Sequence, residues 1–277
     1  MTNPEITNYL ACIGIRKINE LDTALIEVYG QEEGGRHIKN LTALFDQSEE
    51  RLLRGSKNTP YLRRQEALVD YMNQSLEMSL MTSSFYDRVF FRRAMEYLLL
   101  HEHFFCGDIF DIGCGNGILT CFLALLHPDS QVTGIELSQN AVKVAKEFAK
   151  RLQVSNVQFM EPEALPSKSC DTLLSCRTAH ENAAFRPLCE EVKNPALSLP
   201  ELTERHKNYA SELSELIKAE GHLISIERYE DDNAYAGLKC ALNHAGFVQE
   251  RGTHMQFSCK NGDEAATFQG MVFSHGS

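Results

Sequence analysis

Residues 108–117 read Asp108-Ile109-Phe110-Asp111-Ile112-Gly113-Cys114-Gly115-Asn116-Gly117, and an apolar run, residues 118–126, follows them. The residues before the glycines are typical of a short buried strand, and the run after them is typical of a largely buried helix. Glycines between a strand and a helix allow positive φ angles and let the backbone approach a ligand closely. This stretch therefore predicts a strand, a ligand-binding turn and a helix of an α/β fold.

A second apolar run favours a nucleotide site. It ends in Gly134-Ile135-Glu136-Leu137. Glu136 follows Gly117 by about the 20 residues expected of the acidic residue in a βαβ unit. A carboxylate at the end of the next strand can accept hydrogen bonds from both ribose hydroxyls of a nucleoside. We therefore expect the glycine loop and Glu136 to lie together.

The glycine spacing bears on which cofactor is bound. A dinucleotide fingerprint needs a small residue at position 118, but Ile118 stands there and the third glycine is Gly117. The resulting G-x-G-x-G pattern, with Asp111 two residues upstream, resembles the first motif of the class I S-adenosylmethionine-dependent methyltransferases, whose glycine loop holds the amino-acid end of the cofactor. The resemblance implies S-adenosyl-L-methionine as the cofactor. The residues it implies for binding are Asp111, Gly113, Cys114, Gly115, Gly117, Glu136 and Leu137.

Downstream segments follow the order of the same family. Residues 156–160 resemble the third strand, and Glu161 takes the position of the acidic residue that contacts adenine, although Pro162 stands where the family more often has Ala. The fourth, fifth and sixth strands are matched by residues 171–176, 219–227 and 245–247. The resemblance covers residues 105–275. It adds Glu161, Ala164 and Ser175 to the implied cofactor-binding residues.

The expected fold is α/β, with a Rossmann-like, doubly wound, mostly parallel seven-stranded sheet. Asn261-Gly262 favours an antiparallel hairpin at its C-terminal end. Residues 1–82 are expected to form an N-terminal helical extension or lid, and residues 83–277 the methyltransferase domain. Helical periodicity covers residues 15–29, 36–54, 60–81 and 85–104, with breaks at Gly34-Gly35 and residues 55–60. By resemblance these helices cover the cofactor, with residues 83–88 in the lid, and they offer a surface for a homodimer.

Composition argues against several classes of partner. A formal net charge of −11 gives no general attraction for phosphate backbones, which argues against nucleic acid. No apolar stretch approaches the ~18 residues of a membrane span, and no signal peptide is evident, so we expect a cytoplasmic protein. Nine cysteines without a C-x-x-C pair suit reduced thiols. His101 and His103 do not have the four-residue spacing of a zinc-protease helix, so no metal site is expected.

The implied chemistry depends on positioning more than on reactive side chains. The sulfonium methyl group is already electrophilic, so the protein aligns the acceptor with it and excludes water. A hydroxyl or protonated amine acceptor would benefit from a base. His180 and Glu181 follow the fourth strand, at the carboxyl end of the sheet where ligands bind. His180 is the candidate base, Glu181 a weaker candidate to orient it or contact the acceptor, and Tyr86 the weakest.

The acceptor is less well defined by the sequence. The fourth strand ends in Ser175-Cys176-Arg177-Thr178, where adenine and glutamine N-methyltransferases have an Asn-Pro-Pro-Tyr-like motif. Protein arginine methyltransferases carry a pair of glutamates after this strand, and only Glu181 is near. We therefore predict a small-molecule or natural-product acceptor, methylated on oxygen or nitrogen, with residues 182–205 as an insert that shapes its pocket. Four alternatives remain: an arginine-type protein methyltransferase, a non-catalytic regulatory subunit that binds the cofactor, a polyamine synthase and a nicotinamide-dependent oxidoreductase.

Overall fold

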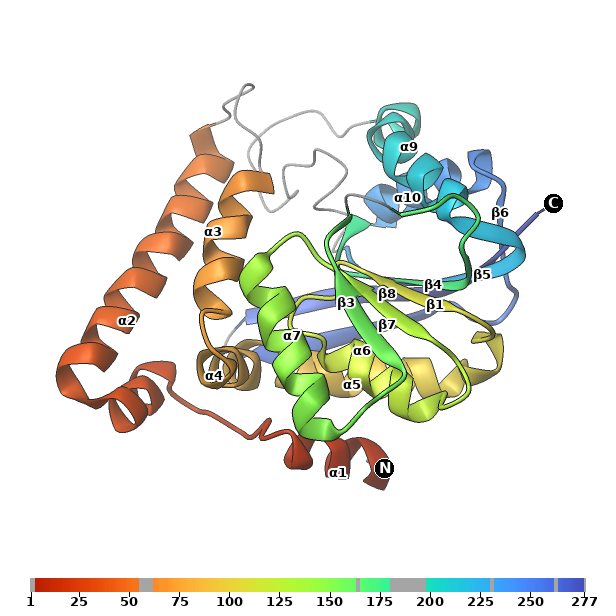
Figure 1. Cartoon of the computed structure of the whole chain (residues 1–277). Helices are drawn as coiled ribbons and strands as arrows, with labels where there is room; N and C mark the ends of the chain where they lie inside the picture. Colours follow the sequence, from red (N-terminus) through yellow and green to blue (C-terminus); the bar gives the residue numbers. More distant parts are fainter. Residues whose placement is uncertain are drawn as a thin grey trace.

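The computed structural model describes residues 3–54, 62–162, 165–179, 198–229, 232–261 and 264–276. The strands of these residues form one sheet of eight, in the order β3-β2-β1-β4-β5-β8-β6, with β7 also paired to β8 (Figure 1). β1 to β5 run parallel to one another, and β8 runs antiparallel to β5, β6 and β7. The strands are β1 Ile109–Ile112, β2 Val132–Ile135, β3 Val157–Met160, β4 Cys170–Cys176, β5 Ile217–Arg228, β6 Phe247–Gln249, β7 Met255–Asn261 and β8 Glu264–His275.

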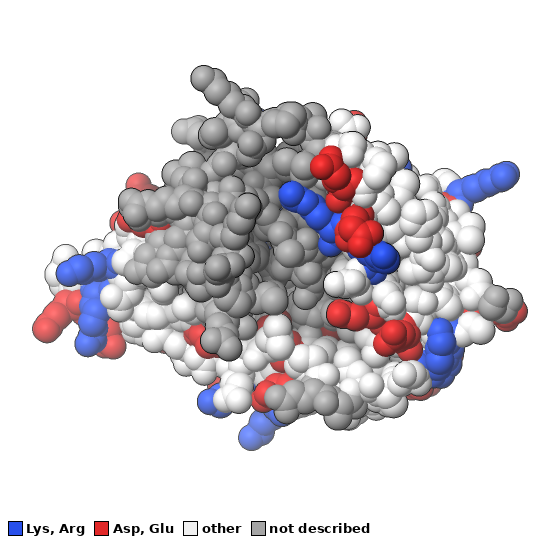
Figure 2. All heavy atoms as spheres, turned by 90° about the horizontal axis from the view of Figure 1, so that it is seen from above, with Lys and Arg blue, Asp and Glu red and all other residues white. Residues whose placement is uncertain are grey.

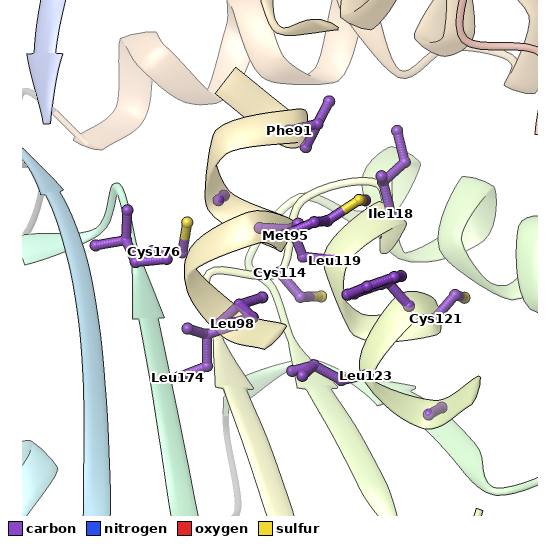
Figure 3. Close-up of a cluster of buried hydrophobic side chains, with 14 of the residues drawn as sticks. Phe91, Met95, Leu98, Cys114, Ile118, Leu119, Cys121, Leu123, Leu174 and Cys176 are labelled. Atoms are coloured by element: carbon purple, nitrogen blue, oxygen red, sulfur yellow. The ribbon is translucent and has the colours of Figure 1, made fainter. Parts of the chain in front are cut away.

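Helices cover both faces of the sheet, because its strands are apolar on both sides. Ile109 and Leu174 belong to the core formed with α5, α6 and α7, whereas their neighbours Phe110 and Leu173 belong to the core formed with α9 and α10. Figure 3 shows side chains of α5 and α6 converging with Leu174. The described helices are α1 Pro4–Cys12, α2 Leu21–Arg54, α3 Leu62–Met72, α4 Leu76–Tyr86, α5 Arg88–Leu100, η1 Glu102–Phe104, α6 Ile118–Leu126, α7 Gln139–Leu152, α9 Leu199–Leu216 and α10 Asp232–His244.

The described residues form one strand more than the seven predicted, because the sixth strand is divided. β6 and β7 pair with the same edge of β8, and the residues between them bulge away at Gly252, whose φ is 78°. The backbone N–H of Val272 donates to Thr253 Oγ1 at 3.1 Å across the interruption. The predicted C-terminal hairpin is confirmed as β7–β8, in which Asn261 pairs with Glu264 and Gly262 lies outside the described residues.

Helix α1 precedes all the segments that showed helical periodicity. Asn3 Oδ1 accepts a hydrogen bond from the Glu5 N–H at 2.9 Å, and Pro4 occupies the first turn, where a missing N–H costs nothing. The Tyr9 hydroxyl then donates to the carbonyl of Ile118 at 2.7 Å. The chain's N-terminal helix therefore supports the first turn of α6, directly after the glycine loop.

The predicted break at Gly34-Gly35 is wrong, because α2 reverses at Gly30 instead. Gly30 has a φ of 80° and a ψ of 169°, outside the helical region, while Gly34 and Gly35 are helical. A Cβ on Gly34 would lie 2.8 Å from the Ile26 Cα. This glycine therefore permits a close approach between the two halves of α2.

The predicted single helix over residues 60–81 is two helices, α3 and α4. Ser75 begins the second, with its Oγ accepting from the Met78 N–H at 3.1 Å. α4 continues to Tyr86 and α5 begins at Arg88 and ends at Leu100, so the predicted helix over residues 85–104 is shorter at both ends. The predicted domain boundary at residues 82/83 falls inside α4. The division of the chain into two domains stays a prediction.

Two further expectations concern the chain as a whole. None of the helices in the described segments is long and apolar enough to cross a membrane. The eight cysteines among the described residues carry free thiols.

Candidate cofactor site

The glycine loop connects β1 to α6 and adopts left-handed backbone angles at three positions. Gly113, Gly115 and Gly117 have φ angles of 69°, 53° and 77°. A Cβ on Gly113 would lie 2.0 Å from Thr178 Cγ2, and a Cβ on Gly117 would lie 2.8 Å from the Ala145 Cβ. A Cβ on Gly115 would meet no atom of the described residues within 4 Å. Protein packing therefore requires two of these glycines, whereas Gly115 faces space that a ligand could fill.

Two predicted residues of the loop region lie beneath it. The Asp111 side chain is 1% exposed and accepts a hydrogen bond from Thr120 Oγ1 at 2.6 Å. Burial raises the pKa of the Asp111 carboxyl to about 7, against the opposing effect of that hydrogen bond. Cys114 is also buried, which raises the pKa of its thiol well above its usual value. Both side chains are buried next to the loop and are placed to hold its backbone in position.

Glu136 reaches the glycine loop from the end of β2. One carboxylate oxygen accepts from the Gly115 N–H at 2.9 Å, and the other accepts from the Ser138 N–H at 2.9 Å. Each carboxylate oxygen can accept a second hydrogen bond. Glu136 is half-buried, so its carboxylate can still meet a ligand. The predicted juxtaposition of the loop and this carboxylate is present.

The neighbouring strand places Glu161 close to Glu136 along the sheet edge. The Glu136 N–H donates to the carbonyl of Met160, the last residue of β3, at 3.1 Å. Glu161 follows it and is exposed, and the Leu137 side chain is 53% exposed. Ala164 lies outside the described residues. Glu136, Leu137 and Glu161 thus occupy the carboxyl ends of two adjacent parallel strands.

Ser175 belongs to a buried polar cluster at the carboxyl ends of β4 and β5. Its hydroxyl lies 2.7 Å from the Tyr209 hydroxyl and 3.0 Å from Thr178 Oγ1, and it donates to Glu227 Oε1 at 2.6 Å. The other Glu227 oxygen accepts from the Ala179 N–H at 3.1 Å. The cluster fixes the turn that follows β4. Neither Glu227 nor Tyr209 was predicted as a site residue from the sequence, although a carboxylate at the end of the predicted fifth strand could have pointed to Glu227.

The turn after β4 also contacts the N-terminal helices. Arg177 donates to Asp87 at 2.6 Å, and its guanidinium lies 5.0 Å from the centroid of the Phe90 ring. Asp87 belongs to the predicted lid, residues 83–88, so part of that segment borders the site. His180 and Glu181 lie outside the described residues and their roles stay predictions.

Tyr86 and His101 both pack against neighbouring aromatic rings. The Tyr86 ring packs 5.3 Å from the Phe45 ring and 4.8 Å from the Phe85 ring. His101 directly follows the last residue of α5. It is buried, and its ring lies 4.5 Å from that of Tyr97. A search of the described residues finds no group of three or more His, Cys, Asp or Glu that could hold a metal ion.

A parallel sheet with a glycine turn after its first strand and a carboxylate after its second defines an α/β protein of the nucleoside-binding kind. A family model described as "Methyltransferase domain" matches residues 107–257, more than half of the chain. The chain belongs to this methyltransferase family, as expected from its resemblance to the class I S-adenosylmethionine-dependent methyltransferases. Membership implies S-adenosyl-L-methionine, rather than a nicotinamide dinucleotide, as the cofactor.

Similar proteins include methyltransferases with different acceptors. The chain is 34% identical over 87 residues to a release factor glutamine methyltransferase of Vibrio cholerae, covering 31% of this chain and 30% of that protein. It is 43% identical over 54 residues to a ubiquinone biosynthesis O-methyltransferase of Albidiferax ferrireducens, covering 20% and 21%. The matches thus span less than a third of these relatives. A solved structure of a putative sarcosine dimethylglycine methyltransferase from Galdieria sulphuraria is 12% identical, with a TM-score of 0.47 over 67% of this chain and 86% of that one.

Alanine at Gly113 is expected to destabilise the protein more than alanine at Gly115. Both substitutions place a side chain at positive φ, which costs about 1–2 kcal/mol. Gly113→Ala also forces a Cβ against Thr178 and adds overpacking of about 1–3 kcal/mol. Urea unfolding of both variants measures the difference. Equal losses of unfolding free energy would contradict the packing assigned to Gly113.

The buried Asp111 carboxyl is expected to make stability pH-dependent. Its folded-state pKa of about 7 lies above its value of about 3.9 in an unfolded chain. The folded state therefore binds the proton more tightly, and stability present at low pH is lost as the pH rises through about 7. Asp111→Asn should show a smaller fall in unfolding free energy between about pH 5 and about pH 7.5. Denaturant titrations at both pH values test this, and identical falls in the two proteins would refute it.

Proposed function

We propose that the chain transfers the methyl group of S-adenosyl-L-methionine to an oxygen or nitrogen of a small molecule. The observation that carries the proposal is the placement of the Glu136 carboxylate on the glycine loop beside the open flank of Gly115. A nucleoside needs an acceptor for its ribose hydroxyls, and a charged amino-acid tail needs backbone that it can approach closely. The described residues offer both at the carboxyl ends of the adjacent strands β1 and β2.

The cofactor fits these residues in defined roles. From the described residues, each Glu136 carboxylate oxygen accepts one hydrogen bond, which leaves capacity for the ribose hydroxyls. The backbone of Gly113, Gly115 and Gly117 would hold the amino-acid end, with Asp111 and Cys114 ordering the loop from below. Leu137 and Glu161 would contact the adenine from the ends of β2 and β3. Ala164 keeps the role given by resemblance. Ser175 would act through the turn after β4.

The cofactor supplies an electrophilic methyl group when bound, and the protein supplies orientation and exclusion of water. The cluster around Glu227 fixes Ala179, the residue directly before His180. A rigid turn at this point would present His180 at the carboxyl end of β4. We propose His180 as the base for the acceptor and Glu181 as the residue that orients it or contacts the acceptor.

A small acceptor agrees with the charge and the sequence of the site. On the face in Figure 2, the Lys and Arg side chains that the structure describes lie beside Asp and Glu side chains rather than in a continuous basic patch. The net charge of −11 also opposes binding of nucleic acid. Although one relative acts on glutamine by its name, β4 ends in Ser175-Cys176-Arg177-Thr178 and not in the Asn-Pro-Pro-Tyr-like motif. These features favour a small molecule over a protein.

Glu136→Ala is expected to weaken binding of the product S-adenosylhomocysteine. Loss of a charged acceptor for the ribose hydroxyls costs about 2–3 kcal/mol, or roughly a hundredfold in Kd. Glu147→Ala, which removes an exposed carboxylate from α7, serves as the matched control. Isothermal titration calorimetry measures both. Wild-type affinity in Glu136→Ala would remove this residue from the site.

The acceptor class is tested by release of S-adenosylhomocysteine from S-adenosylmethionine. The wild-type protein is incubated with a panel of small phenols, carboxylates and amines, and separately with glutamine-containing and arginine-containing peptides. We expect turnover with a member of the small-molecule panel. His180→Ala should lower that turnover about a hundredfold while S-adenosylhomocysteine affinity stays at the wild-type level. Turnover with peptides alone would refute the small-molecule assignment, and full activity of His180→Ala would refute the base.

A further inference from the structure

Both halves of the candidate cofactor site are hydrogen-bonded to the same pair of N-terminal helices. The first tie comes from Asn116 in the glycine loop. Its Nδ2 donates to Ser79 Oγ and to Ser83 Oγ, each at 2.9 Å, so both amide hydrogens are used. Asn116 Oδ1 accepts from the Ile118 N–H at 3.4 Å. The loop is therefore attached to two hydroxyls one turn apart on α4.

The second tie comes from the turn after Glu136. Ser138 Oγ donates to the carboxylate of Asp70 on α3, and Asn140 Nδ2 donates to the Asp70 backbone carbonyl at 3.2 Å. Ser138 Oγ also accepts from the Ala141 N–H at 3.1 Å and so caps α7. The segment between β2 and α7 is thereby attached to α3.

These two ties belong to one closed circuit of hydrogen bonds. On the site side, Glu136 joins them by accepting from the N–H groups of Gly115 and Ser138. On the helix side, Ser79 Oγ donates to Asn73 Oδ1 at 2.7 Å, and Asn73 Nδ2 donates to the carbonyl of Val69 on α3 at 2.8 Å. The circuit passes from α3 through Ser138, Glu136 and the glycine loop to α4, and returns to α3.

Burial makes the helix side of the circuit sensitive to any loss of a partner. Ser79, Ser83 and Asn73 are all buried. A buried polar group that loses its partner keeps the cost of its desolvation without the hydrogen bond that offsets it. Displacement of α3 and α4 from the core would break the bonds of Ser79 and Ser83 to Asn116 and of Asp70 to Ser138. It would thereby release the glycine loop and the segment after Glu136, whose Gly115 and Ser138 N–H groups orient the Glu136 carboxylate. The position of the α3–α4 pair and the orientation of the Glu136 carboxylate therefore depend on each other.

We propose that Asn116 and Asp70 are positioning residues that couple occupancy of the cofactor site to docking of the α3–α4 pair. The proposal rests on the cofactor site assigned above. A ligand on Glu136 favours the arrangement in which the circuit is closed, so it stabilises the docked helices. By thermodynamic reciprocity, the docked helices raise cofactor affinity by the same factor. The N-terminal helices are in this respect part of the cofactor site.

Hydrogen exchange of the full chain with and without S-adenosylhomocysteine tests the coupling. In the wild-type protein, the ligand is expected to slow exchange of the amides of α4. Asn116→Ala should lose this ligand-dependent protection and show about a tenfold higher Kd by calorimetry, equal to ~1.4 kcal/mol. Thr82→Val is the matched control on α4, because the buried Thr82 hydroxyl donates to carbonyls of its own helix, at 3.0 and 3.2 Å, and to no other group of the described residues. It should keep both wild-type affinity and protection.

The opposite tie is tested by a pair of variants at one position. Asp70→Ala removes the acceptor of Ser138 and should weaken binding and protection as Asn116→Ala does. Asp70→Asn keeps an oxygen acceptor and should retain most of both. If Asn116→Ala does not fold, Ser83→Ala removes one of the same bonds from the helix side and is expected to act in the same direction.

The possible results separate the coupling from the cofactor assignment. Binding of S-adenosylhomocysteine to the wild-type protein with unchanged exchange in α4 would overturn the coupling and leave the cofactor site standing. The same holds if Thr82→Val and Asn116→Ala lose affinity equally. Absence of binding to the wild-type protein would overturn both.

Discussion

The double hydrogen bond of the Glu136 carboxylate is the interaction on which the candidate site depends. It accepts from Gly115 in one loop and from Ser138 in the next, at 2.9 Å each. Because β1 and β2 are adjacent and parallel, the two loops leave the sheet at the same edge. The carboxylate ties them together and remains half-buried. The group joins the glycine loop to Ser138, which is in turn bonded to α3.

The glycine loop shows how packing and binding divide the same motif. Gly113 makes room for Thr178 from the turn after β4, and Gly117 makes room for Ala145 of α7. Gly115 alone of the three faces open space. The motif therefore locks β4 and α7 against the loop as well as leaving space for a cofactor. This packing brings the turn after β4 close to the loop.

Local sequence patterns predicted much of the sheet, but they did not predict which residues distant in the sequence contact one another. The apolar run after Gly117 is α6 with the predicted bounds, since burial on all sides leaves a continuous signal. The break in α2 was predicted at Gly34-Gly35 but lies at Gly30. Three glycines stand close together in this part of the sequence, and only tertiary packing selects one of them. Tyr209 and Glu227, which bond to Ser175, and the two serines that bond to Asn116 lie more than 30 residues away in the sequence. The periodicity of either segment does not predict such pairs.

A crystal structure of the protein with S-adenosylhomocysteine tests the central claim most directly. We expect both ribose hydroxyls on the Glu136 carboxylate, the homocysteine tail against Gly115, and α4 still bonded to Asn116. A nucleoside bound elsewhere, or bound at the loop with Glu136 turned away from its ribose, would rule out this role of Glu136.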